Sequence, residues 1–152
     1  MIELRSAKSH HIREVARHLC VEDRHELILF GSPGAEHEVI CSARDACICD
    51  VVIGDDGTPV ALCGVSGVER GRVWMLRTSG LWATTSHRRQ IPGIAKRWVG
   101  EQAKTQGPVL WNWALASNTG NLKWLQSLGF IVDKPSPMGP SAALFSYFWR
   151  ES

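Results

Sequence analysis

The residues best suited to bind an anion lie between positions 88 and 97. Small residues stand there among four cations, which are Arg88, Arg89, Lys96 and Arg97. Gly93 and Ala95 would let the backbone approach an anion closely, and free amides at a helix start attract negative charge. Pro92 suits the first position of such a helix, because its missing N–H would have no partner there. The segment predicts a phosphate site, although an ordinary helix start would show the same pattern.

Candidates for proton transfer are found outside this segment. They are three residues of one expected helix and one residue of a later turn: Asp23, His25, Glu26 and Glu69. Carboxylates and imidazoles act as general bases when they are held beside a reacting group, directly or through water. A solvated surface charge is the alternative for each of them. Asp23 and Glu26 would also favour a helix N-terminus.

Other chemistries are not supported by the spacing of reactive residues. The five cysteines and six histidines show no paired metal-binding spacing, so no metal site is expected. No Gly-x-Ser-x-Gly motif follows a strand, which argues against a serine hydrolase. The formal net charge is +2, with 17 basic and 15 acidic residues scattered along the chain. This distribution predicts neither nucleic-acid nor membrane binding.

The elements that must position these residues follow from hydrophobic periodicity. At 152 residues and 44% hydrophobic content, the chain fits a single domain over 1–152. An odd number of cysteines and no N-terminal signal sequence predict reduced thiols in a cytoplasmic protein. Strands are expected over 2–6, 47–53, 59–68, 73–78, 109–116, 131–133 and 142–149. Helices are expected over 9–19, 21–30, 35–43, 92–106 and 118–128.

Among these elements, the segment 109–130 shows the clearest secondary-structure signals. An apolar strand interrupted only by Asn112 runs into a helix that Asn118 can cap with its side-chain oxygen. A leucine stripe follows at helical spacing, and a glycine ends the helix: Leu122, Leu125, Leu128 and Gly129. We therefore expect Leu125 to be buried in the core.

This strand, Asn118 and the amphipathic helix ending in Leu-Gly-Phe130 resemble a conserved segment of the GNAT superfamily, the acetyl-CoA-dependent N-acetyltransferases. The family's cofactor signature, Arg/Gln-x-x-Gly-x-Gly/Ala, is similarly matched by the segment 90–95. The resemblance implies an α+β, three-layer fold, with a mixed, bent sheet of six to seven strands and about four helices. Strands 73–78 and 109–116 would run parallel and splay apart, with the intervening helix allowing parallel pairing.

The resemblance also implies a cofactor and its site. Acetyl-CoA or CoA would contact Arg88, Arg89, Gln90, Gly93 and Ala95 with its pyrophosphate, and Asn118 with its pantetheine arm. The family commonly places a proton-donating Tyr seven residues after this Asn. That position is Leu125 here, and the strand 73–78 lacks the family's usual glutamate base.

Two functions therefore stay open. One is an acyl-CoA-dependent N-acyltransferase, monomeric or homodimeric, that acts on an unidentified small-molecule or protein amine. The other is a non-catalytic protein on the same scaffold, since Asp23-Arg-x-Glu26 and Trp74 to Thr78 resemble GNAT-like proteins of bacteriophages and prophages. That resemblance implies a virion or host protein as partner, and a location in the bacterial cytoplasm or the virion.

Overall fold

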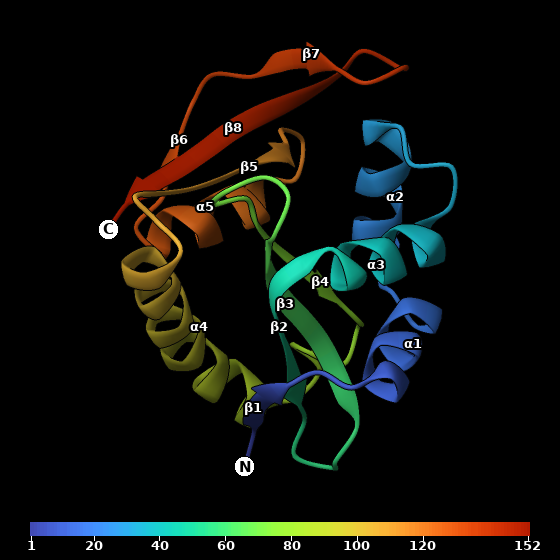
Figure 1. The fold of residues 1–152 in the computed structure, drawn as a ribbon. Coiled ribbons are helices and arrows are strands. Elements are labelled where there is room, and N and C mark those ends of the chain that lie inside the picture. The colour runs from blue at the N-terminus through green and yellow to red at the C-terminus, as the bar shows by residue number, and fades with distance from the viewer.

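Two antiparallel sheets form the frame of the molecule, whose computed structural model describes residues 1–152 (Figure 1). The first sheet has the order β1 (Glu3–Ser6), β2 (Ala46–Ile53), β3 (Pro59–Ser66) and β4 (Val73–Arg77). The second has the order β5 (Val109–Leu115), β8 (Ala143–Glu151) and β6 (Ile131–Val132). A further short strand, β7 (Ser136–Met138), pairs with β8.

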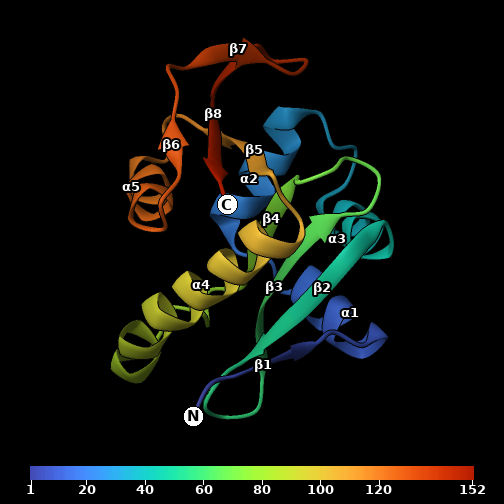
Figure 2. The same ribbon diagram turned by 60° about the vertical axis from the view of Figure 1, so that its left-hand side comes forward.

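Five helices cover the sheets. They are α1 (Ser9–Arg17), α2 (Val21–Phe30), α3 (Ala35–Arg44), α4 (Thr85–Thr105) and α5 (Thr119–Ser127). The first sheet lies between α1 and α3 on one face and α4 on the other (Figures 1 and 2). No helix combines the length and apolar content that a bilayer crossing requires.

Burial on both faces explains the composition of β3. Its residues from Val60 to Val65 are all buried. Leu62 packs with Val15 of α1 and Val39 of α3, whereas Ala61 packs with Ile91 of α4. Successive residues of a strand point to opposite faces, so a sheet covered on both sides needs a continuous apolar run.

The predicted fold class is confirmed, with three differences in detail. The chain has five helices and eight strands in place of about four helices and six to seven strands. The additional strand, β7, lies between the strands expected over 131–133 and 142–149, where no element was expected. The single mixed sheet is instead two antiparallel sheets.

The division falls between β4 and β5. Arg72 and Trp111 form one isolated parallel bridge, in which Trp111 N–H donates to Gly71 O at 2.9 Å. The strands diverge beyond this point, so they run parallel and splay as expected but belong to separate sheets.

Asn112 stands where the divergence begins. Its Nδ2 donates to Val73 O of β4 at 2.8 Å. Its Oδ1 accepts hydrogen bonds from Arg72 Nε at 3.2 Å and from Trp113 N–H at 2.8 Å. A side chain thus takes the place of a neighbouring strand's backbone, which satisfies the edge of β4 without drawing the strands together.

Replacing Asn112 tests this role. We expect Asn112→Ala to lower the free energy of unfolding by about 3 kcal/mol, because it leaves Val73 C=O and Trp113 N–H without partners. Urea unfolding measures the loss. Asn121→Ala, at a partly exposed asparagine of α5, should cost less than about 0.5 kcal/mol. Equal losses in the two variants would contradict the role.

Candidate active site

A cleft of about 640 Å³ lies between the diverging strands. Residues of β4, β5, α2, α4 and α5 line it, together with the start of the β3–β4 turn. Its volume is in the range of small-molecule and cofactor sites. Because the strands separate, the backbone N–H and C=O groups on the facing sides of β4 and β5 do not pair with each other and need other hydrogen-bond partners.

Two carboxylates of α2 supply some of those partners. Asp23 Oδ2 accepts from the backbone N–H of Arg77, at the end of β4, at 2.8 Å. Glu26 Oε1 accepts from the backbone N–H of Leu115, at the end of β5, at 2.6 Å. Residues three apart share one helix face, so α2 holds both strand ends across the gap.

Burial of these carboxylates changes their titration. Desolvation raises the pKa of Glu26 to about 7, against the smaller lowering effect of its bond to Leu115; the nearby Asp23 charge adds to the rise. Desolvation also raises the pKa of Asp23, and the Arg77 backbone and charge oppose that rise. Glu26 therefore titrates near neutral pH, where a general base works best.

The other two predicted bases are placed differently. His25 is exposed and does not line the cleft. Glu69 lines the opening of the cleft and forms an ion pair with Arg72. A surface location is therefore correct for His25, whereas it is wrong for Asp23 and Glu26, which are only partly exposed and face the cleft.

The helix expected to begin at Pro92 begins seven residues earlier. Thr84 caps α4, and its Oγ1 accepts from His87 N–H at 3.1 Å. Pro92 consequently lies inside the helix. Gly93 and Ala95 then lie in helical backbone, where an amide normally donates to the preceding turn. The free amides on which the predicted phosphate site rested are not at these residues.

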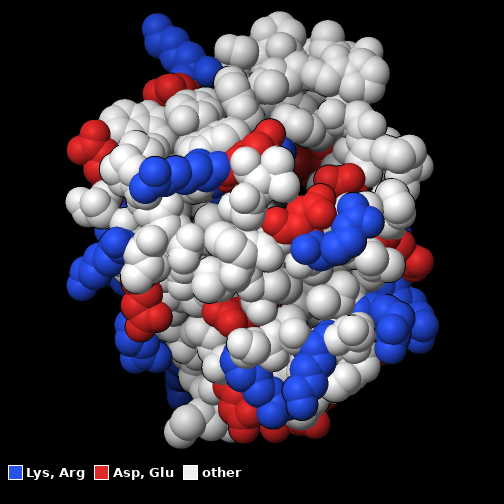
Figure 3. Space-filling model, viewed as in Figure 1, with Lys and Arg blue, Asp and Glu red and all other residues white.

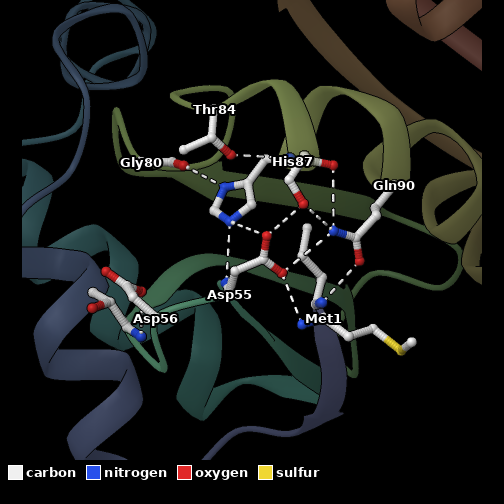
Figure 4. A network of polar contacts seen from close by, with 10 residues as sticks. Met1, Asp55, Asp56, Gly80, Thr84, His87 and Gln90 are labelled. Carbon is white, nitrogen blue, oxygen red and sulfur yellow. Dashed lines mark hydrogen bonds and ion pairs between the residues drawn. The ribbon is translucent and has the colours of Figure 1, made fainter.

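A polar network holds the added turns in place (Figure 4). Ser86 Oγ donates to Asp55 Oδ2 at 2.6 Å, and His87 Nε2 accepts from Asp55 N–H at 3.1 Å. The other ring nitrogen of His87 lies 2.9 Å from Gly80 O, which fits a neutral imidazole with its proton on Nδ1. The Ser86 hydroxyl and then the N-terminal ammonium lower the pKa of Asp55 to about 2.

Gln90 belongs to the same network. Its Oε1 accepts from Ile2 N–H at 2.9 Å, and its Nε2 donates to Ser86 Oγ at 2.8 Å. Of the predicted phosphate-binding residues only Ala95 lines the cleft. Arg88 and Arg89 are exposed near the start of α4, and no side chain lies within 4 Å of the Cβ position of Gly93.

The helix α5 forms another wall of the cleft. Asn118 caps it as predicted, accepting from Asn121 N–H at 3.3 Å. Asn118 itself does not line the cleft, whereas Asn121, Trp124 and Leu125 of α5 do. Leu128 is buried, whereas Leu125 is only partly buried at the cleft wall, so its expected burial in the core is wrong. The leucine stripe of α5 lies along the edge of the cleft, so no other atoms pack over part of the stripe.

Sequence reasoning missed two features of this site. Asn112 initiates the divergence, and its only signal was one polar residue in an apolar strand. Trp124 of α5 lines the cleft, packs edge-to-face on Trp82 with ring centroids 5.1 Å apart, and buries an Nε1 that has no acceptor. A tryptophan on an amphipathic helix is most often a core residue, so no sequence signal marked this position. The five cysteines are free, and no group of three or more metal-ligating side chains is present.

Several solved N-acetyltransferases share this architecture, and their similarity to the chain shows that it has the GNAT fold. Spermidine N-acetyltransferase from Vibrio cholerae, solved with CoA and spermine, matches with a TM-score of 0.71 and 10% identity, over 99% of this chain and 95% of that one. A GNAT-family acetyltransferase from Streptococcus pneumoniae matches with a TM-score of 0.60 and 12% identity over 99% of both chains.

A third match is the ribosomal-protein-S18-alanine N-acetyltransferase from Escherichia coli, with a TM-score of 0.62 and 12% identity over 98% of this chain and 92% of that one. Identities this low show the fold alone. No protein-family model matches the sequence, and no curated protein matches it. The resemblance to phage proteins has no support from these structures and stays a prediction.

The titration of Glu26 can be tested through stability. Its pKa is about 7 in the folded chain and ordinarily 4.5, so the folded state binds the extra proton between these values. Stability should therefore fall as pH rises from about 4.5 to 7. Glu26→Gln keeps an acceptor for Leu115 N–H, and should be more stable than the parent at pH 8 by roughly 2 kcal/mol.

Denaturant unfolding across this pH range measures the effect. Asp23 faces Glu26 and titrates in the same direction, so part of the slope should remain in the variant. Glu36→Gln, at an exposed residue of α3 outside the cleft lining, should keep the parent profile. A Glu26→Gln profile parallel to the parent at all pH values would show that Glu26 titrates normally.

Proposed function

We propose that the protein is an acyl-CoA-dependent N-acyltransferase that uses acetyl-CoA and acts on an amine. The observation that carries this proposal is Glu26, a carboxyl with a pKa of about 7 in the cleft between the diverging strands. Acyl transfer to an amine requires removal of a proton from an ammonium group before or during attack. Similarity to acetyltransferases in fold agrees with this assignment and does not by itself establish it.

The cleft wall fits the chemistry of a pantetheine chain, which carries amide groups. The β3–β4 ladder alternates, since Ser66 N–H donates to Arg72 O and Thr78 N–H donates to Val60 O. Odd-numbered residues of β4 therefore turn their peptide groups toward the cleft. Asp23 takes the N–H of Arg77 and Asn112 takes the C=O of Val73, while Met75 between them faces the cleft.

Trp124 in the cleft wall also fits a ligand that carries amide groups. Trp124 Nε1 is buried without an acceptor, a situation that costs about 1–3 kcal/mol. An amide carbonyl in the cleft would supply the missing acceptor. The neighbouring wall is apolar, with Leu81 and Ile91, Ile94, Ala95 and Trp98 of α4. Arg88 and Arg89 near the start of α4 are the cations available to phosphate groups, and the helix rises about 10 Å from Arg88 to Ala95.

Each side chain then has a defined task. Acetyl-CoA supplies a thioester as the acyl donor. Glu26 accepts the proton of the acceptor ammonium, directly or through water, while Leu115 N–H and α2 fix its position. Asp23 holds the end of β4 and contributes negative charge that favours the ammonium. We assign Glu69 no part in proton transfer, because Arg72 already pairs with it.

The site has no tyrosine that could donate a proton to the leaving thiolate. The only tyrosine, Tyr147, packs on Trp113 with ring centroids 5.1 Å apart and does not line the cleft. Solvent must then protonate the thiolate, which predicts slow turnover. The non-catalytic alternative rests on this same feature.

Calorimetric titration with CoA tests cofactor binding. We expect binding to weaken roughly tenfold when both Arg88 and Arg89 are replaced by Ala, since two charge-assisted contacts to phosphate are lost. The matched control is the double replacement of Lys96 and Arg97, which removes the same charge farther along α4. Gly93→Glu should bind nearly as well as the parent.

Other results would change the proposal. Loss of binding in Gly93→Glu alone would place the phosphates over the third turn of α4 and not at its start. Absence of any heat with CoA at about 1 mM would favour the non-catalytic alternative.

Leu125 offers a test of the missing proton donor. Leu125→Tyr places a phenol at the cleft wall, and general acid catalysis contributes about a hundredfold or more where it operates. We expect at least tenfold faster release of free CoA thiol in the presence of an amine. Leu122→Tyr, one turn earlier and outside the cleft lining, is the control. An unchanged rate in Leu125→Tyr would mean that thiolate protonation does not limit turnover.

A further inference from the structure

The cleft has two halves of different charge. Five carboxylates line it, all on the half formed by α2, α3 and the β3–β4 turn: Asp23, Glu26, Glu38, Asp45 and Glu69. The only cations in the lining are Arg72 and Arg77. Figure 3 shows acidic side chains gathered around a hollow on this face. The chain as a whole carries a formal net charge of +2, so this concentration of negative charge is local.

Three of these carboxylates form no ion pair. Asp45 pairs with Arg44 and Glu69 with Arg72, but none of the ion pairs in the chain includes Asp23, Glu26 or Glu38. Asp23 and Glu26 each accept a hydrogen bond from a backbone N–H group, and the nearby Arg77 charge only partly opposes the rise of their pKa values. Glu38 Oε2 accepts from Ser32 Oγ at 3.3 Å. A partly buried carboxylate without a counter-ion is costly, and a ligand cation would offset that cost.

The fold prevents these groups from finding partners by themselves. Asp23 is held by Arg77 N–H, and Cys20 N–H donates in turn to Arg77 O at 2.9 Å, which anchors the start of α2 to β4. Glu26 is held in the same way at β5. The two charges on α2 are thus fixed toward the cleft. Glu38 of α3 adds a third on the same wall.

A hairpin restricts the shape of the ligand. The tip between β7 and β8 lies over the end of α2 in both ribbon views (Figures 1 and 2). Ser141 Oγ donates to Leu29 O at 3.5 Å, and Phe145 packs edge-to-face on Phe30 with ring centroids 5.0 Å apart. Phe30 and Phe145 both line the cleft, so the contact between the hairpin and the end of α2 closes one side of the acidic half, where a slender chain fits more easily than a bulky group.

We propose that the acceptor is a small linear amine with at least two positive charges, one placed at Glu26 for reaction and another held at Glu38. This proposal rests on the proposed function for the reaction, and on the unpaired carboxylates alone for binding. Phe30 also lines this half, but Arg72 already lies over its ring, 5.9 Å from the centroid, so the carboxylates carry the recognition of the ligand cation.

A matched pair of probes tests the charge requirement without cofactor. Diaminopentane and pentylamine have the same chain length and differ by one ammonium group. We expect the diamine to bind roughly tenfold more tightly by NMR titration at low salt. The difference should shrink as salt is added, because screening weakens attraction between partly exposed charges.

Two variants of α3 locate the second charge. Glu38→Gln should remove most of the preference for the diamine and leave pentylamine binding unchanged. Glu36→Gln removes an equal charge from the first turn of the same helix, but Glu36 is exposed and outside the cleft lining. It should therefore keep the preference, and it controls for general electrostatics.

The outcomes separate this proposal from the proposed function. Diamine binding with the stated preference, but no CoA binding, would retain a polycation site and reject the acyltransferase. CoA binding with equal affinity for the two amines, or with no amine binding at about 10 mM, would overturn the proposal alone. Tighter binding of a lysine-rich peptide than of the diamine would also overturn it, in favour of a protein acceptor.

Discussion

Divergence of β4 from β5 is the constraint on which the rest of this structure depends. Parallel strands that separate expose peptide groups inside the molecule, and those groups must find other partners. Asn112 satisfies one position at the branch point, and Asp23 and Glu26 satisfy the two strand ends. Side chains therefore hold the two sheets at a fixed separation, and the remaining space is the cleft.

The same contacts give the cleft its chemistry. A carboxylate that accepts a backbone N–H inside a cleft is only partly compensated for lost hydration, so its pKa rises. Glu26 shows this most strongly, with a pKa of about 7. Its charge is unfavourable for folding above that pH and useful for proton transfer near it. The structure thus loses stability at the residue that we propose as the base, and such local losses are common at functional sites.

Much of the fold could be predicted from the sequence because local signals and tertiary packing agree there. The strand and helix of 109–128 carry their own caps, stripe and terminating glycine, and α5 follows them. The start of α4 could not be predicted in this way. Thr84 is a capping residue, but the turns before Pro92 are held by Asp55 and Ile2, which are distant in sequence. Pro92 is compatible with a helix start, but these contacts stabilise the turns before it, and the helix begins at Thr85.

The candidate site was predictable in its residue types and less so in their roles. Asp23 and Glu26 appear on a helix with almost no amphipathic pattern, so a surface location was the natural expectation. They face inward because the gap between β4 and β5 offers N–H donors that no periodicity reveals. Conversely, Gln90 and Gly93 matched a phosphate motif, yet the helix there starts too early for the motif's amides to be free. A motif depends on where its helix begins, which long-range contacts decide. Here the same kind of contact, a polar side chain on a distant backbone amide, determined both the start of α4 and the inward direction of α2.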